Sequence, residues 1–297
     1  MLIAEGSGIR VYTLDAGRIW LDGGAMFGVV PKPLWERCIP ADGRNRIPIA
    51  MRCLLIEVEG VRVLVDDGLG NRESAKFMAL HGVENGGNPT RLEDSLRRVG
   101  IEPEDVDLVV NTHLHFDHAG GNTFRDPDGE VRAAFPNARY IVRRGEWEVA
   151  HLDNARIRAG YHLDSFDPLM REDRLDLVTE DREIARGVRL VHTPGHTVDH
   201  QSVVVDLGGE TVCYLADLVP TSAHVRPSWI MAYDLEPLRS LETKLELLTR
   251  AGRERWQLVF EHDPRVAVAR ASPGPGGRGC ELEDVREDED VKMRGGS

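Results

Sequence analysis

Three histidines and one aspartate lie within six positions of one stretch, His113 to His118 (HLHFDH), directly after the apolar residues 106–110. A single helix or strand cannot place all four side chains on one face, but a strand end followed by a turn can aim them at one point. Imidazole and carboxylate groups are the ligands that zinc and similar divalent metals prefer. A polar loop whose histidines only form hydrogen bonds is the alternative. The two pairs, His113 with His115 and Asp117 with His118, favour two metal positions.

Three further candidate ligands each follow a predicted strand: His196 in TPGHT, Asp217 in YLAD and His262 in FEHD. With these residues in this order, the sequence resembles the metallo-β-lactamase-fold hydrolase superfamily. The resemblance implies an α/β (α+β) fold, a four-layer αββα sandwich in which helices flank two mixed β-sheets.

Metal-site chemistry and the resemblance imply the same ligand assignment. One metal would be held by His113, His115 and His196, the other by Asp117, His118 and His262, with Asp217 bridging them. Zinc is the expected metal, and manganese, cobalt or iron are alternatives. A hydroxide between two such metals would be available near neutral pH to attack a carbonyl or phosphoryl centre. Asp66, in the turn Asp66-Asp67-Gly68, resembles the family aspartate that orients a metal-binding histidine; a plain Asp-Gly turn is the alternative.

The motifs HFDHAGGN (115–122) and TPGHT (193–197) resemble the lactonase branch, which opens N-acyl-homoserine lactones, and especially its arm-bearing quorum-quenching members. Zinc β-lactamases commonly carry a cysteine where this chain has Asp217, so antibiotic hydrolysis is less favoured. Two alternatives share the fold: an organophosphate hydrolase resembling methyl parathion hydrolase, and an iron-containing redox protein. A non-catalytic binding module is disfavoured because all seven expected ligands are present.

Substrate contacts are predicted from the resemblance and from apolar side chains. Many lactonases carry a tyrosine three residues after the bridging aspartate, where this chain has Pro220; Tyr233 or His224 could replace it, or both could simply pack. By resemblance, Asp117 would pass a proton to the leaving alkoxide. An apolar channel for an acyl chain would be lined by four residues: Met26, Phe27, Trp229 and Met231. Packing of the Met26-Phe27 tip in the core is the alternative.

Composition predicts a soluble globular protein, because 41% of the 297 residues are hydrophobic and 29% are charged. We expect one domain over residues 1–270, with an extended loop or arm at 22–50 and a disordered acidic tail at 271–297. A formal net charge of −13 argues against nucleic acid as a partner, and no apolar run is long enough to span a membrane. The four cysteines suggest no disulfide framework. A cytoplasmic location is therefore expected, and the arm resembles that of dimerising relatives, so a homodimer is expected.

Apolar, β-branched runs bounded by turn residues predict strands at residues 9–13, 19–21, 51–58, 61–66, 106–111, 138–142, 188–192, 201–206, 211–215 and 256–260. A capping box that begins at Thr90 predicts a helix that ends at Gly100. Further helices are predicted at residues 144–152 and from Pro237. In the last of these, an apolar stripe predicts the buried face: Leu238, Leu241, Leu245 and Leu248.

Overall fold

The computed structural model describes residues 1–287, and within them the strands form two seven-stranded sheets and one two-stranded sheet. The first sheet has the order β1 (Leu2–Gly6), β2 (Ile9–Asp22), β3 (Arg46–Val58), β4 (Val61–Val65), β5 (Leu108–Val110), β8 (Arg139–Arg143) and β9 (Leu175–Val178). The second has the order β10 (Arg182–Ala185), β11 (Val188–His192), β12 (Gln201–Asp206), β13 (Thr211–Tyr214), β14 (Gln257–Val259), β15 (Val266–Pro273) and β16 (Cys280–Glu287). The small sheet pairs β6 (Thr123–Arg125) with β7 (Val131–Ala133).

Short helices connect the strands and cover the sheets. The α-helices are α1 (Gly23–Phe27), α2 (Lys32–Trp35), α3 (Ala75–His81), α4 (Arg91–Arg98), α5 (Phe116–Ala119), α6 (Arg144–Ala150), α7 (Asp167–Arg171) and α8 (Pro237–Glu254). The 3-10 turns are η1 (Pro103–Asp105), η2 (Gly120–Asn122), η3 (Leu163–Ser165), η4 (Ala216–Leu218), η5 (Ser222–Val225) and η6 (Pro275–Gly277). None of the helices in residues 1–287 combines the length and apolar character that a membrane crossing requires.

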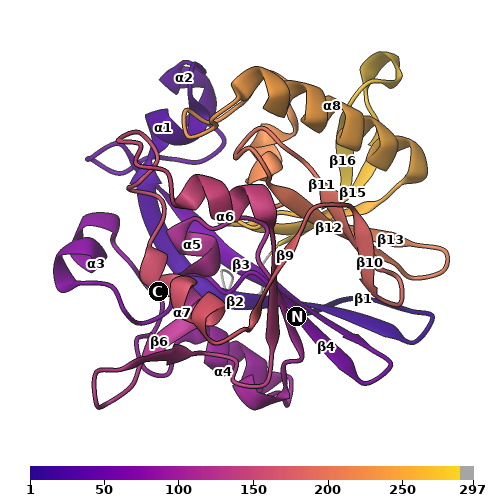
Figure 1. The fold of residues 1–297 in the computed structure, drawn as a ribbon. Coiled ribbons are helices and arrows are strands. Elements are labelled where there is room, and N and C mark those ends of the chain that lie inside the picture. Colours follow the sequence, from indigo (N-terminus) through magenta and orange to yellow (C-terminus); the bar gives the residue numbers. More distant parts are fainter. Residues whose placement is uncertain (288–297) are drawn as a thin grey trace.

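The two large sheets pack face to face through apolar side chains. Buried Val11 and Ile56 of the first sheet share one core with Val203 and Val212 of the second. The outer face of the first sheet packs against α4, and the outer face of the second packs against α8, so that the helices form the two outer layers. Figure 1 shows α8 and α4 on opposite sides of the molecule. The predicted four-layer sandwich is confirmed.

Both sheets are mixed, and their parallel pairs matter for the site. β4, β5, β8 and β9 run parallel to one another, as do β13 and β14, whereas the other neighbours are antiparallel. Parallel strands end at the same edge of a sheet.

The strands predicted at residues 188–192 and 201–206 are confirmed as β11 and β12. The two strands predicted at 9–13 and 19–21 form one strand, β2, with an irregularity between Asp15 and Arg18.

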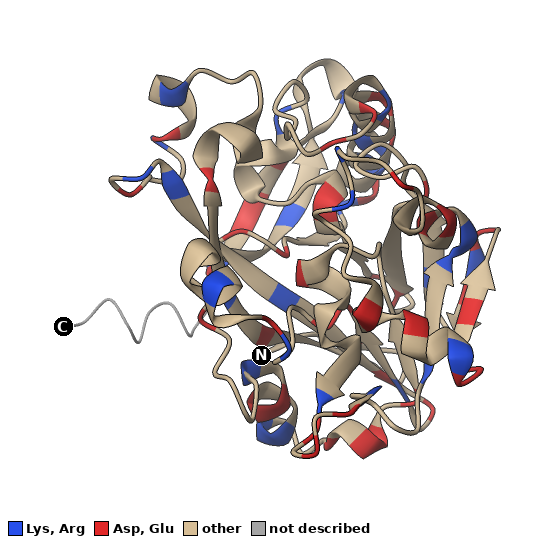
Figure 2. Ribbon diagram, turned by 60° about the vertical axis from the view of Figure 1, so that its left-hand side comes forward, with Lys and Arg blue, Asp and Glu red and all other residues tan. Residues whose placement is uncertain are grey.

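The predicted disordered tail from residue 271 is wrong as far as residue 287. β15 extends to Pro273 and pairs with β16, where Cys280 is buried against the core under α8. The acidic side chains point outward, and Glu283 pairs with Arg255 at 2.9 Å. The average composition of the segment does not reveal which of its residues point inward and which point outward. Residues 288–297 lie outside the described residues. Figure 2 shows acidic and basic residues intermixed along the same elements.

The predicted arm at residues 22–50 is shorter than expected. It contains α1 and α2, but β3 begins at Arg46, which pairs with Asp22 at the end of β2. The segment turns back on itself because the Asp22 side chain caps α1 by accepting a hydrogen bond from the Ala25 amide at 2.8 Å. The arm is therefore two short helices and a loop, anchored at both ends by one strand pair.

The predicted buried face of α8 is also partly wrong. Leu238 is 77% exposed, whereas Leu247, Leu248 and Ala251 are buried together with Lys244. A lysine at the centre of a buried face breaks the apolar pattern on which the prediction depended.

Candidate metal centre

The seven predicted ligands all follow the ends of strands at one edge of the sandwich. His113 and His115 come after β5, and α5 then carries Asp117 and His118. His196 follows β11, Asp217 lies on η4 after β13, and His262 follows β14. Because β13 and β14 are parallel and β5 is parallel to β4, the loops that leave these strands meet at the same edge. The structure brings the seven residues into two adjacent groups.

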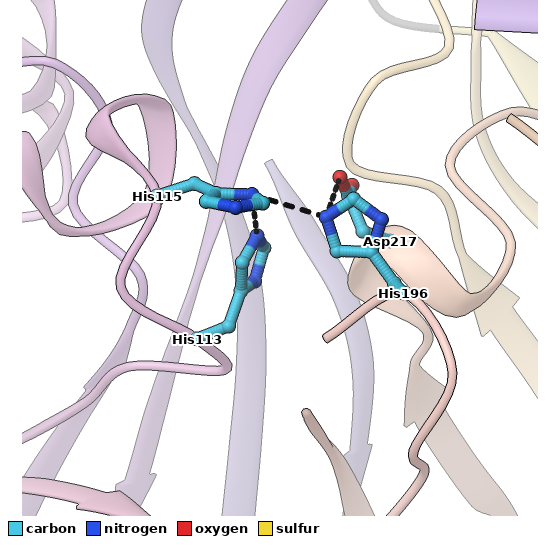
Figure 3. Close-up of side chains that lie close together, drawn as sticks. All are labelled: His113, His115, His196 and Asp217. Atoms are coloured by element: carbon cyan, nitrogen blue, oxygen red, sulfur yellow. Dashed lines mark hydrogen bonds and ion pairs between the residues drawn. The ribbon is translucent and has the colours of Figure 1, made fainter. Parts of the chain in front are cut away.

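The first group contains His113, His115, His196 and Asp217. His115 Nδ1 lies 3.0 Å from His113 Nε2 and 3.1 Å from His196 Nε2. In Figure 3, His113 and His115 approach from one side, and His196 and Asp217 face them from the other. Three ring nitrogens and a carboxylate oxygen therefore point at a common position.

The second group contains Asp117, His118 and His262. His118 Nε2 lies 3.1 Å from His262 Nε2, and Asp117 Oδ2 lies 3.8 Å from the same His262 nitrogen. Asp217 stands between the groups, because its Oδ2 is 3.1 Å from His196 Nε2 and its Oδ1 is 3.0 Å from His262 Nε2. The carboxylate of Asp217 thus reaches both groups with different oxygens.

Four of the histidines donate their outer ring N–H to an oxygen of the protein. The Nδ1 donors and their acceptors are His113 with Thr112 Oγ1 (3.1 Å), His118 with Asp66 Oδ2 (3.1 Å), His196 with Asp234 Oδ1 (3.0 Å) and His262 with the Ala50 carbonyl (2.7 Å). Thr112 Oγ1 accepts from His113 because its own proton goes to Asp66 Oδ2, 2.7 Å away. In the neutral form, in which they can bind a metal, these imidazoles have only one N–H each, so their inner nitrogens then carry lone pairs.

The inner atoms therefore fit a metal cation. Lone pairs that face one another at about 3 Å repel and cannot form hydrogen bonds with one another. Asp217 Oδ1, which is buried, accepts no hydrogen bond within residues 1–287. A divalent cation would satisfy all of these groups at once, and outer N–H donation to fixed acceptors is the usual support of metal-binding histidines.

The electrostatics of the buried groups show that the site attracts positive charge. Although burial opposes it, the Asp217 carboxylate raises the pKa of His262 to about 9 when no metal is bound, so a bound cation would take the place of this proton. Burial and the neighbouring ring of His118 lower the pKa of His113 well below its usual range, so His113 stays neutral and can offer a lone pair. Although burial opposes it, positive charge on the imidazoles of His262 and His196 lowers the pKa of Asp217 well below its usual range. Asp217 is therefore ionised at neutral pH, so its carboxylate can bind a cation.

The two groups open into a pocket of about 430 Å³. Of the predicted site residues, the structure places eight on its lining: Met26, His115, Asp117, His196, Asp217, Met231, Tyr233 and His262. His113 and His118 are buried beneath it. The remaining wall is largely apolar. Its apolar residues include Leu21, Ile49, Phe116, Ile157 and Leu235. Arg156 and His81, which the sequence analysis did not select, are also on the lining.

Two of the four predicted substrate-lining residues, Phe27 and Trp229, are not on the pocket lining. Phe27 is buried in an aromatic cluster, stacked between Trp35 (ring centroids 5.3 Å apart) and His224 (4.6 Å), with Trp229 edge-on at 5.6 Å. The prediction that Phe27 and Trp229 line the channel is therefore wrong, and core packing of this tip holds instead. Consecutive side chains of a helix point about 100° apart, so α1 places Met26, but not Phe27, on the pocket lining.

The sequence model of the metallo-β-lactamase superfamily matches residues 51–262. This chain belongs to the metallo-β-lactamase superfamily. An N-acyl homoserine lactonase from a Bacillus species is 30% identical to it over 205 residues, which cover 66% of this chain and 70% of that protein. The chain is therefore a hydrolase of this superfamily and a homologue of N-acyl homoserine lactonases, as the sequence resemblance predicted.

Solved structures of the superfamily share the fold. A probable metal-dependent hydrolase from Staphylococcus aureus has a TM-score of 0.87 and 30% identity, covering 96% of this chain and 99% of the other. An N-acyl homoserine lactone hydrolase, solved with the product N-hexanoyl-L-homoserine at its catalytic metal centre, has a TM-score of 0.65 and 26% identity, covering 86% of this chain and 93% of that one.

Two buried carboxylates beside the metallo-β-lactamase site were missed from the sequence. Asp234 accepts from His196, and Glu261 Oε2 lies 3.1 Å from the Nδ1 of His118, which Asp66 also contacts. Burial raises the pKa of Glu261 above its usual range. Asp234 lies near the end of the long connection that follows the candidate ligand Asp217, and Glu261 directly precedes the candidate ligand His262. Many surface acids have comparable neighbours in the sequence. No signal in the sequence distinguishes these two from them.

His224 does not reach the substrate pocket, so its predicted catalytic role is wrong. Its Nε2–H donates to the Met26 carbonyl at 2.8 Å, and its Nδ1 accepts from the Thr221 hydroxyl at 2.7 Å. Both ring nitrogens are used, and the ring is buried. Burial lowers the pKa of His224 from 6.5 to about 4.

This lowered pKa predicts an acid-sensitive contribution to stability. Between pH 6.5 and pH 4 the unfolded chain takes up a proton at His224 and the folded chain does not, so stability falls as the pH falls. From pH 7 to pH 5, the wild-type protein should lose about 2 kcal/mol more unfolding free energy than a His224→Gln variant. Denaturant unfolding of both proteins at several pH values measures the difference. Parallel curves would show that His224 titrates normally.

Proposed function

We propose that this protein is a dinuclear metal-dependent lactonase that opens the ring of N-acyl-homoserine lactones. The observation that carries the proposal is the position of the metal-binding groups at the base of an open, largely apolar pocket of about 430 Å³. Such a pocket suits a small polar ring at the metals and an acyl chain along the apolar wall. Homology to the Bacillus lactonase supports this substrate class.

The proposed metal ligands fall into two sets that share Asp217. One divalent ion would be held by His113, His115 and His196, the other by Asp117, His118 and His262, with Asp217 bridging. Zinc suits this nitrogen and oxygen donor set best, and manganese, cobalt or iron could replace it. When bound, such ions lower the pKa of water to near neutrality and polarise the substrate carbonyl.

Two side chains on the pocket lining are proposed to handle protons and orientation. Asp117 lines the pocket at the second group, where its carboxylate can take up the proton that the attacking water gives up and pass it to the leaving alkoxide. Burial raises the pKa of Tyr233 to about 12, so its hydroxyl stays protonated and can donate a hydrogen bond to the lactone or amide carbonyl. Asp66 and Asp234 orient His118 and His196 through their Nδ1–H groups.

The test is a rate comparison on purified protein of known metal content. We expect hydrolysis of a homoserine-lactone series to fall at least about tenfold with a chelator and to recover with zinc. Paraoxon-type phosphotriesters should react more slowly than the best lactone. A preference for phosphotriesters over every lactone would overturn the proposal and favour the organophosphate-hydrolase alternative.

We also propose that the protein is a cytoplasmic homodimer that uses the arm as its interface. Val29, between α1 and α2, is 94% exposed, and Leu34 on α2 is also exposed, so the arm presents apolar side chains outward. All four cysteines are free thiols, which suits a reducing compartment. Light scattering measures the oligomeric state, and a monomeric mass would contradict the dimer.

A further inference from the structure

Lys244 is a buried cation on the inner face of α8. Its side chain is only 1% exposed, and its Nζ lies 3.2, 3.3 and 2.6 Å from the carbonyl oxygens of His224, Arg226 and Trp229. A buried ammonium is unfavourable unless its protons meet acceptors, and these carbonyls supply three. One side chain thus holds three points of the segment 224–229, most of which is neither helix nor strand.

The same segment continues into one wall of the pocket. Met231 and Tyr233 line the pocket directly after it, and Asp234 accepts from the metal-site residue His196 at 3.0 Å. A second hydrogen bond attaches the same stretch to the candidate metal centre, because the Leu235 amide donates to the His196 carbonyl at 2.9 Å. Any shift of residues 224–229 therefore moves the pocket wall.

The arm is attached to this segment as well. His224 Nε2 donates to the Met26 carbonyl at 2.8 Å, and the Ala232 amide donates to the Ala25 carbonyl at 2.8 Å. At Gly28, whose φ is +56°, an added Cβ would lie 2.4 Å from the Ile230 carbonyl oxygen, so the two backbones are in direct contact. Met26, the arm residue on the pocket lining, thus depends on the position of the segment that Lys244 holds.

We propose that Lys244 is a positioning residue that fixes the wall formed by Met26, Met231 and Tyr233 and so determines which acyl chains the pocket accepts. The proposal rests on the lactonase function proposed above. Lys244 touches neither the pocket nor the metal-binding side chains, so it would act through the backbone of residues 224–229. A purely structural lysine would change stability but leave the relative preference among substrates unchanged.

The first test compares wild-type protein with Lys244→Met, which keeps most of the side-chain volume and removes the donors. We expect the ratio of kcat/KM for a decanoyl to a butanoyl homoserine lactone to change about fivefold or more, mainly through KM, with metal content unchanged. Arg239→Met is the matched control, because Arg239 lies on the same helix with an exposed side chain and should leave the ratio unchanged. An unchanged ratio in folded Lys244→Met would overturn the proposal.

A second test needs no substrate and a milder variant, Lys244→Gln. Hydrogen exchange should become at least about tenfold faster in residues 224–235 and 23–28, and remain unchanged in β11 and β12. Equal exchange in all of these segments would refute the positioning role. If wild-type protein hydrolyses no lactone, the proposed function fails, and the exchange result still decides whether Lys244 holds the wall.

Discussion

Replacing His115 with alanine should lower the rate of lactone hydrolysis by at least about a thousandfold. His115 Nδ1 lies between the inner nitrogens of His113 and His196, at 3.0 and 3.1 Å, so its loss removes the central donor of the first group. The variant should also bind less metal, which elemental analysis measures. Turnover at the wild-type rate would contradict the dinuclear mechanism proposed above.

The fold should tolerate this change, since His115 is only partly buried and lines the pocket. In metal-free protein the melting temperature should stay about the same, because the His115 side chain lines the pocket and is not part of the tightly packed core. His151→Ala is a suitable control: His151 pairs with Asp167 at 2.9 Å near the surface, and its loss should change the rate by less than about twofold.

Replacing Asp66 with asparagine should weaken metal binding roughly 10- to 100-fold. Asp66 is fully buried, and its two oxygens accept from the Thr112 amide (2.7 Å), the Thr112 hydroxyl (2.7 Å) and His118 Nδ1 (3.1 Å). Asparagine keeps the shape and tolerates the φ of +55° at this position, but its NH₂ group cannot accept. In either orientation of the amide at least one buried donor is left unpaired, and an NH₂ group in place of Oδ2 removes the acceptor of His118 Nδ1; unfolding should become easier by about 2 to 3 kcal/mol.

Asp67→Asn is the matched control for this prediction. Asp67 is the next residue and is also buried, but neither of its oxygens accepts a hydrogen bond within residues 1–287. Burial raises the pKa of Asp67 well above its usual range, so the amide replaces a neutral carboxyl. Calorimetric titration with zinc should show a normal affinity for Asp67→Asn and a weakened one for Asp66→Asn. Equal affinities would mean that Asp66 does not orient His118.

The sequence by itself was sufficient to identify the residues that converge at the centre. Ligand-type side chains are recognisable by residue type and by their place after apolar strands, both of which are local features. The capping box of α4 was predictable for the same reason: Thr90 and Glu93 are three residues apart, and the Thr90 amide donates to Glu93 at 2.6 Å. The superfamily order of His196, Asp217 and His262 completed the set.

Only the tertiary structure decided what surrounds those residues. The acceptors of His196 and His262 are Asp234 and the Ala50 carbonyl, which lie 38 and 212 positions away in the chain. Such partners depend on how distant segments of the chain meet in the fold, and nothing in the sequence next to a carboxylate or carbonyl identifies its partner. The choice between Met26 and Phe27 as pocket residue likewise depended on which side of α1 faced the aromatic cluster.

The same distinction explains the incorrect predictions at the C-terminal part of the chain. Composition describes a segment in isolation, and the acidic residues after 280 do not by themselves form a core. β15 offers them an unpaired strand edge, and Arg255 and Arg270 offer opposite charges to Glu283 and Asp284. Lys244 is a further example. Its burial is explained by carbonyl groups of residues 224–229, which contact α8 only in the folded protein. The sequence therefore determined which chemical groups are available, and long-range packing determined which groups contact one another.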